Sequence, residues 1–115
     1  MGIPNNTRQT ASNAVAALGN WVSIHLTSAG GGTTGANEPV GGTYARKQCA
    51  WTPNGTGGNI GSEQTIPAPP GIYYEAGVFS ASTAGTFVGS GPFPGGAIEI
   101  IGANGSIVVV AAINV

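Results

Sequence analysis

The chain has 115 residues, enough for one domain and too few for two. Only 6% of its residues are charged, against about 25% in ordinary soluble domains, and its net charge is -1. Three basic side chains are too few for a phosphate-binding face, and no apolar run approaches the roughly 20 residues of a membrane-spanning helix, so neither nucleic acid nor a membrane is an expected partner.

The scarcity of charge predicts that much of the surface is either covered by other protein chains or coated with small polar residues and glycine. We favour coverage, because a free monomer ordinarily needs a more strongly charged surface to remain soluble. The lone cysteine, Cys49, excludes an internal disulfide and fits synthesis in a reducing cytoplasm. The first residues lack the basic start and the apolar stretch of a secretory signal peptide.

The first expected element is a helix over about residues 6–19. Asn6 is placed to cap it, and Gln9 follows three residues later, as in a capping box. Gly19 is a typical residue just beyond a helix C-terminus. We expect the helix to pack on a sheet or on a sister chain through a thin apolar stripe at helical spacing, made of Ala11, Ala14, Val15 and Leu18.

Short strands are expected from residue 21 onward, separated by turns rich in glycine and proline. The first strand alternates clearly, with Val22, Ile24 and Leu26 on one face. Long glycine-rich loops are expected at 28–42 and 53–61. The segments expected as strands are 21–27, 43–51, 62–66, 72–80, 86–89, 97–101 and 106–115.

Two hairpins are expected: one over residues 72–89, and one in which the turn signal Asn104-Gly105 joins the last two strands. Residues 1–115 should therefore form a single mainly β domain, a small antiparallel β-sandwich or barrel of six to seven short strands with one N-terminal α-helix. The residues expected in its core are Val22, Ile24, Leu26, Val78, Ile98, Ile100, Val108 and Val110.

Residues able to do chemistry are few and scattered, so we expect no enzyme, no catalytic residues, no metal site and no cofactor. His25 and Cys49 are the only soft metal ligands, too few for a zinc site within one chain. We expect His25 to be half-exposed and bonded to a neighbouring strand, and Cys49 to be a small buried side chain. No feature of the sequence brings together two of Glu63, Glu75 and Glu99 as the carboxylate pair of a glycosidase.

The most informative cluster begins at Glu38 and ends at Arg46. Tyr44 and Arg46 are two residues apart in an expected strand and so project from the same face. We expect Glu38 to fold back onto Arg46 as an ion pair that fixes the loop at 28–42. The pair could form within the chain or across an interface, and the sequence leaves both open.

The same region resembles a known family. Thr34-Gly35-Ala36-Asn37-Glu38, followed by Gly41-Gly42-Thr43-Tyr44-Ala45-Arg46, is similar to segments of small virion proteins of tailed bacteriophages, described as capsid decoration or tail-fibre-like proteins. The resemblance continues through residues 74–81 and 85–89. It also takes in the helix with residues 21–25, so it spans most of the chain, and its style is that of phages of actinobacterial hosts.

The resemblance implies a non-enzymatic structural protein of the virion and carries over no catalytic residues. It points first to a capsid decoration (cement) protein, made in the host bacterial cytoplasm, that binds the outer face of the major capsid protein shell as a homo-oligomer. The alternative is a minor tail or tail-fibre-associated protein that contacts other tail proteins or the host surface. The residues we expect at interfaces are Ala11, Val15, Leu18, Trp21, Glu38, Tyr44 and Arg46.

Overall fold

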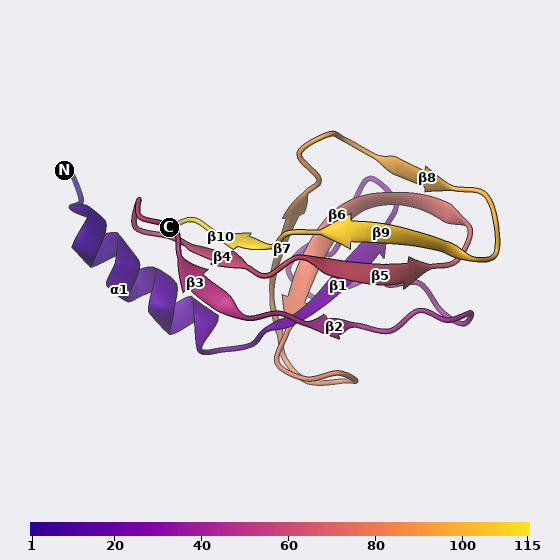
Figure 1. Ribbon diagram of the computed structural model, residues 1–115, viewed down its shortest axis with the longest axis horizontal. Coiled ribbons are helices and arrows are strands. Elements are labelled where there is room, and N and C mark those ends of the chain that lie inside the picture. Colours follow the sequence, from indigo (N-terminus) through magenta and orange to yellow (C-terminus); the bar gives the residue numbers. More distant parts are fainter.

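The computed structural model describes all 115 residues and confirms a mainly β fold with one N-terminal helix (Figure 1). The sheets are antiparallel and curl into a half-barrel, and the helix projects from one end of the molecule. There are ten strands instead of six to seven, because several are only two or three residues long. In chain order the elements are α1 (Asn5–Ala16), β1 (Trp21–Leu26), β2 (Lys47–Gln48), β3 (Trp51–Pro53), β4 (Asn59–Gly61), β5 (Gln64–Ala68), β6 (Gly71–Phe79), β7 (Phe87–Pro92), β8 (Ile98–Ile100), β9 (Gly105–Val109) and β10 (Ala112–Ile113).

The largest sheet is built around β6, which is also the longest strand. One edge of β6 pairs with β1, and β1 pairs in turn with β2. The other edge pairs with β7 along its second half and with β8 at residues 71–73. The β6–β7 pairing confirms the hairpin expected over residues 72–89.

A second layer, made of β5 and β9, packs against this sheet (Figure 1). Since β5 also lies beside β2, the strands follow one another around the half-barrel from β9 through β5, β2, β1 and β6 to β7. The half-barrel is therefore open between β7 and β9. A third small sheet, in the order β10-β4-β3, extends toward α1.

The hydrophobic core lies between the two layers, where β-branched side chains from alternating positions meet. Val22 and Ile24 of β1 are completely buried there, as expected, and so is Tyr73 of β6. The thiol of Cys49 is also buried, which confirms its expected place. The core cluster comprises Val22, Ile24, Cys49, Ile66, Ala68, Tyr73, Phe93, Ile107 and Val109.

The helix differs from the expectation at both ends. Its N-cap residue is Pro4, which makes no side-chain capping bond, and Gln9 bonds to the Asn13 side chain instead of closing a capping box. The helix ends at Ala16, before the expected 19. Its single buried residue is not on the alanine stripe: it is Ser12, whose Oγ accepts a 2.7 Å hydrogen bond from the side chain of a buried β4 asparagine, Asn59.

The strand expected at 43–51 is wrong, because it is broken into β2 and β3 and residues 43–46 lie outside any strand. The loop expected at 53–61 is in part β4, which folds back on β3 as a small hairpin. Asn54 shapes this turn, since its Oδ1 accepts hydrogen bonds from the backbone N–H groups of Thr56 and Gly58.

The second expected hairpin is also wrong. β8 pairs with β6 and β9 pairs with β5, so the Asn104-Gly105 turn leads the chain from one layer to the other. β5 continues beyond the expected end at residue 66, through Pro67 to Ala68. A proline is tolerated there because β5 has a hydrogen-bonded strand along one edge only.

The expected core is wrong for two of its eight members. Val108 and Val110 are largely exposed, while Ile107 and Val109 point into the core. A shift of one residue reverses the face on which every side chain of a strand lies, and an unbroken apolar run gives no alternation from which to choose. The four other members that are not fully buried are Leu26, Val78, Ile98 and Ile100, and they are half-buried.

A pair of neighbouring valines tests this register. Val109 is 4% exposed and Val108 is 56% exposed. Val109→Ala should lower the free energy of unfolding by about 2 kcal/mol, from the two lost methyl groups and the cavity they leave. Val108→Ala should cost about 0.5 kcal/mol or less. Urea unfolding of both variants measures this difference, and equal losses would contradict the register.

Candidate functional site

Two features stand out as candidate sites: the polar cluster under the loop that follows β1, and an apolar groove at the open side of the half-barrel. The cluster begins with β1, of which both faces are buried. Val22 and Ile24 face the core, and Ser23 and His25 face the opposite side, and all four are fully buried. Residues 27–37 supply the cover on that opposite side, so the long glycine-rich loop packs against the sheet.

Close approach of the loop requires glycine at several positions. An added Cβ at Gly30 would overlap the side chain of Glu75, and one at Gly35 would lie 2.6 Å from the ring of Phe79. Both glycines also have positive φ. The loop is held from below by Glu75 of β6, whose Oε1 accepts hydrogen bonds from the N–H of Gly31 at 2.8 Å and from the hydroxyl of Ser90 at 2.7 Å.

His25 lies at the centre of this covered face, which corrects the expectation of a half-exposed side chain. Its Nδ1 is 2.6 Å from the carbonyl oxygen of Ala36. A carbonyl only accepts, so Nδ1 carries a proton and donates it. Nε2 is 2.8 Å from Oγ of Ser23, and the imidazole is stacked on the ring of Phe79 with an interplanar angle of 16°.

A serine and a histidine at hydrogen-bond distance also occur in the nucleophile–base pairs of hydrolases. Here both side chains have no exposed surface, so no substrate can reach Oγ of Ser23 in this conformation. The pair instead provides hydrogen-bond partners for polar atoms that would otherwise be buried without them. We interpret it as part of the packing between loop and sheet.

The ion pair between Glu38 and Arg46 forms within the chain and fixes the end of the loop. Arg46 binds the carboxylate with both arms of its fork, Nε to Oε2 at 2.9 Å and Nη2 to Oε1 at 2.7 Å. The hydroxyl of Tyr44 donates to the same Oε2. Nη1 of Arg46 donates to the carbonyls of Ala81 and Ala84 at the tip of the β6–β7 hairpin. We call Glu38, Tyr44 and Arg46 the loop clamp.

The loop clamp uses most of its hydrogen-bonding groups within the chain. The guanidinium of Arg46 lies 3.5 Å from the centre of the Phe79 ring, and the Arg46 side chain is only 8% exposed. Four of its five N–H donors bond to Glu38 and to the hairpin carbonyls. A shallow pocket of about 370 Å³ beside the clamp therefore offers a ligand little charge.

Opposing effects set the protonation of the clamp. Burial alone raises the pKa of Glu38, but the hydrogen bonds from Arg46 and Tyr44 outweigh it and hold that pKa below its ordinary value. Burial, with the bond to Glu38, raises the pKa of Tyr44 far above its ordinary value, so the phenol stays a donor. The hydrogen bond to Glu38 raises the pKa of Arg46.

The seven residues expected at interfaces do not form one surface. Glu38, Tyr44 and Arg46 come together in the loop clamp. Ala11 and Leu18 are exposed on and just after the helix, Val15 lines the apolar groove, and Trp21 is half-buried at the start of β1. The structure therefore gives the clamp residues a role within the chain and leaves the others as interface predictions.

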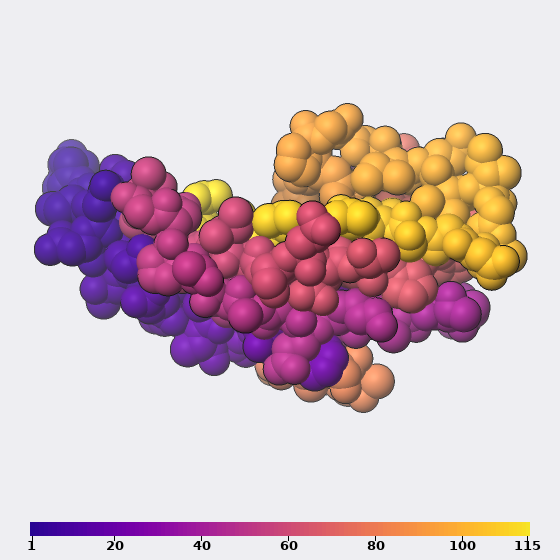
Figure 2. Space-filling view, in the orientation of Figure 1, coloured from indigo at the N-terminus to yellow at the C-terminus, as the bar shows by residue number.

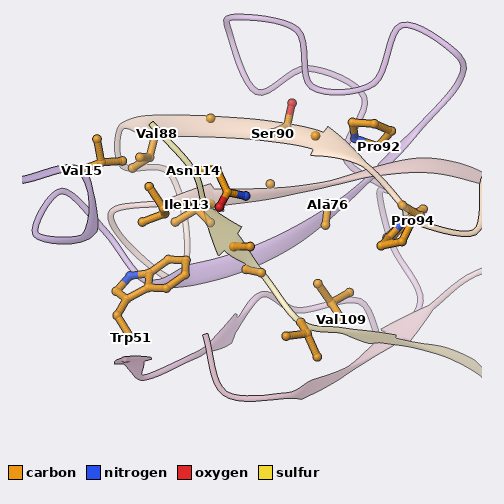
Figure 3. A pocket seen from close by; sticks show the side chains of 18 of the residues that line it. Val15, Trp51, Ala76, Val88, Ser90, Pro92, Pro94, Val109, Ile113 and Asn114 are labelled. Carbon is orange, nitrogen blue, oxygen red and sulfur yellow. The ribbon is translucent and has the colours of Figure 1, made fainter. Parts of the chain in front are cut away.

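The apolar groove was missed by sequence reasoning. It lies between β7 on one side and β9, β10 and the last residues of the chain on the other, with a volume of about 650 Å³. Figure 2 shows a notch there, between the end that carries α1 and the orange lobe that includes β7. Figure 3 looks into it, with Val88 and Pro92 from β7, Ile113 from β10 and Trp51 from β3 along its walls.

No side chain that lines the groove is charged. The signal that could have revealed it is the run Val88-Gly89-Ser90-Gly91, in which glycine occupies every second position of a strand and leaves one face bare. Ser90 turns its hydroxyl away from the groove, toward Glu75. The groove thus exposes backbone and valine methyl groups.

The remaining reactive side chains are isolated. Burial raises the pKa of the Cys49 thiol, which favours the unreactive protonated form. No three side chains among His, Cys, Asp and Glu lie close enough together to hold a metal ion. The single helix is too short and too polar to cross a membrane.

No family model, no curated protein and no solved structure matches the chain.

Two glycines with positive φ test how tightly the loop must pack. Gly35→Ala should lower the free energy of unfolding by about 2–5 kcal/mol, because the left-handed conformation costs about 1–2 kcal/mol and the overlap with Phe79 adds about 1–3 kcal/mol. Gly41→Ala is the matched control: its φ is +85° but its added Cβ meets nothing, so only the conformational cost applies. Chemical denaturation compares them, and equal losses would contradict a packed loop.

The dependence of stability on pH tests the loop clamp. Because the pKa of Glu38 is lowered in the folded state, its contribution is complete above the unfolded pKa of about 4.3 and is lost as the pH falls through the folded value. Glu38→Gln should cost about 3 kcal/mol at pH 7, since it leaves Arg46 without its counter-charge.

This cost should shrink as denaturation is repeated from pH 7 down to pH 3. Glu63→Gln, at an exposed glutamate, is the control and should change stability by about 0.5 kcal/mol or less. A Glu38→Gln cost that is small at pH 7, or that stays constant with pH, would count against the clamp.

Proposed function

We propose that this chain is a non-enzymatic structural protein of a tailed-phage particle, and specifically a capsid decoration protein that binds the outer face of the major capsid protein shell. The observation that carries the proposal is the surface: 6% charged residues, an apolar groove without charge, and exposed Leu18, Val40 and Ile101. A surface so poor in charge is suited to being covered by other protein.

The use of the polar side chains supports a structural role. His25, Ser23, Glu38, Arg46 and Glu75 hold the loop after β1 against the sheet. Groups that serve an enzyme are instead found at the edge of a cleft that a substrate can enter. The cleft of this chain, the apolar groove, is lined without any acid, base or histidine.

The resemblance to phage virion proteins supports the place in the particle. Its most specific segment contains Glu38, Tyr44 and Arg46, which form the loop clamp. If the virion proteins share these three residues with this chain, they also have the means to hold the loop in the same way. The resemblance favours a shared fold, and the unpaired edges of β7 and β9 are what such a fold would present to neighbouring subunits.

Counting copies in the purified phage that encodes the chain tests the proposal. Quantitative mass spectrometry should find this chain at a copy number comparable to that of the major capsid protein, and antibodies against it should label heads. Particles that lack the chain should lose their DNA at a lower temperature, since each bound copy adds contacts between capsid subunits. A few copies per particle, with label on the tail, would overturn the decoration role in favour of the minor tail alternative.

A further inference from the structure

We propose that the apolar groove between β7 and β9–β10 is the surface through which two copies of this chain associate about a two-fold axis. The groove marks the open side of the half-barrel, where the two-stranded layer β5–β9 fails to cover the whole of the larger sheet. This inference concerns the isolated chain and does not depend on the particle proposed above.

The first argument comes from glycines that the chain itself does not need. Gly89 and Gly91 lie inside β7 and line the groove, and neither has positive φ. A Cβ added at either position would meet nothing within 4 Å. Glycine within a strand costs about 0.5–1 kcal/mol relative to alanine. Two such residues therefore weaken β7, and no contact within the chain requires them.

Other glycines of the same sheet behave differently. A Cβ at Gly77, the neighbour of Ser90 on β6, would lie 2.6 Å from Nε2 of His25, so packing within the chain explains that glycine. At Gly89 and Gly91 the corresponding space is empty. A bare strand backbone beside an open groove is where a second backbone can approach closely.

The second argument comes from the two strand edges at the groove. β7 is hydrogen-bonded only to β6, and β9 only to β5, so each has an edge without a strand partner. Unpaired edges beside exposed apolar side chains favour pairing with another chain. In a two-fold dimer each copy gives and receives the same contacts, so both edges of both copies can be satisfied at once.

The third argument identifies the occupant as a copy of this chain. Ordinary protein surfaces are rich in charge, and burying a charge in a groove that offers no counter-charge is costly. The rim of this groove is itself made of apolar side chains: Val108 is 56% exposed and Val110 is 48% exposed. These valines of one copy can fill the space above the bare glycines of the other.

The two sides of the groove also differ in shape. The lining combines a bare, hollowed wall on β7 with a rim of valines on β9–β10. Each patch is thus complementary to a rotated copy of itself, as a two-fold contact requires.

Sedimentation equilibrium of the full chain with paired variants tests the inference. The unmodified chain should be a dimer. Filling the groove with Gly89→Val and Gly91→Val together should weaken association by at least about 100-fold, because two branched side chains occupy the space the partner needs. Gly95→Val with Gly102→Val is the matched control, since these loop glycines are equally open, and it should leave the dimer unchanged.

The stability of the monomer provides a second measurement, and here we expect no loss in the variant whose association is weakened. At concentrations where the unmodified chain is monomeric, the groove-filled variant should be at least as stable, because valine is a better strand residue than glycine. Val110→Lys adds a variant at a half-exposed side chain, which should fold normally and also lose the dimer. An unmodified chain that stays monomeric at every concentration would overturn the proposal, as would groove-filled or Val110→Lys variants that dimerise like it.

Discussion

Covering the second face of β1 is the constraint on which the rest of this fold depends. One face of β1 packs into the core between the layers, and the other carries Ser23 and His25, which are buried just as completely. A buried imidazole needs a partner for each ring nitrogen. Ser23 supplies one, and the second, the carbonyl of Ala36, comes from the loop, so the loop has to return across the strand that it has just left.

The loop can return only under two conditions, and both are visible in the sequence. It has to be thin, which explains glycine at positions where a Cβ would strike Glu75 or Phe79. It also has to be held at its far end, which the loop clamp does by joining Glu38 to Arg46 and Arg46 to the hairpin between β6 and β7. Three of the few charged side chains, Glu38, Arg46 and Glu75, serve this one loop. Removing one partner of such a buried or partly buried pair is costly, because it leaves the other charge without compensation.

The sequence predicted the structure well in two situations: where apolar and polar residues alternate along a strand, and where charged residues are so few that their partners are evident. β1 and β6 alternate clearly, and their bounds were predicted to within a residue or two. The pairing of Glu38 with Arg46 was predictable because a chain with so few charges offers few other partners. The register of β9 was not, because an apolar run without alternation can turn either face inward, and it is the pairing with β5 that decides. The non-strand conformation of residues 43–46 was also missed, since the bonds of Tyr44 and Arg46 to Glu38 join the segment to a residue outside it.

The glycines differ once each is tested against its surroundings. Gly30, Gly31 and Gly35 of the loop after β1, and Gly77 beneath it, are explained by atoms of this chain that a side chain would displace. Gly89 and Gly91 have no such explanation, and they face the one place where a layer of the half-barrel is incomplete. A residue that weakens its own strand while filling no role inside the chain is best explained by contacts outside it. The abundance of glycine, which at first indicates only loops and turns, therefore has more than one physical cause, and one of them locates the surface on which another chain should lie.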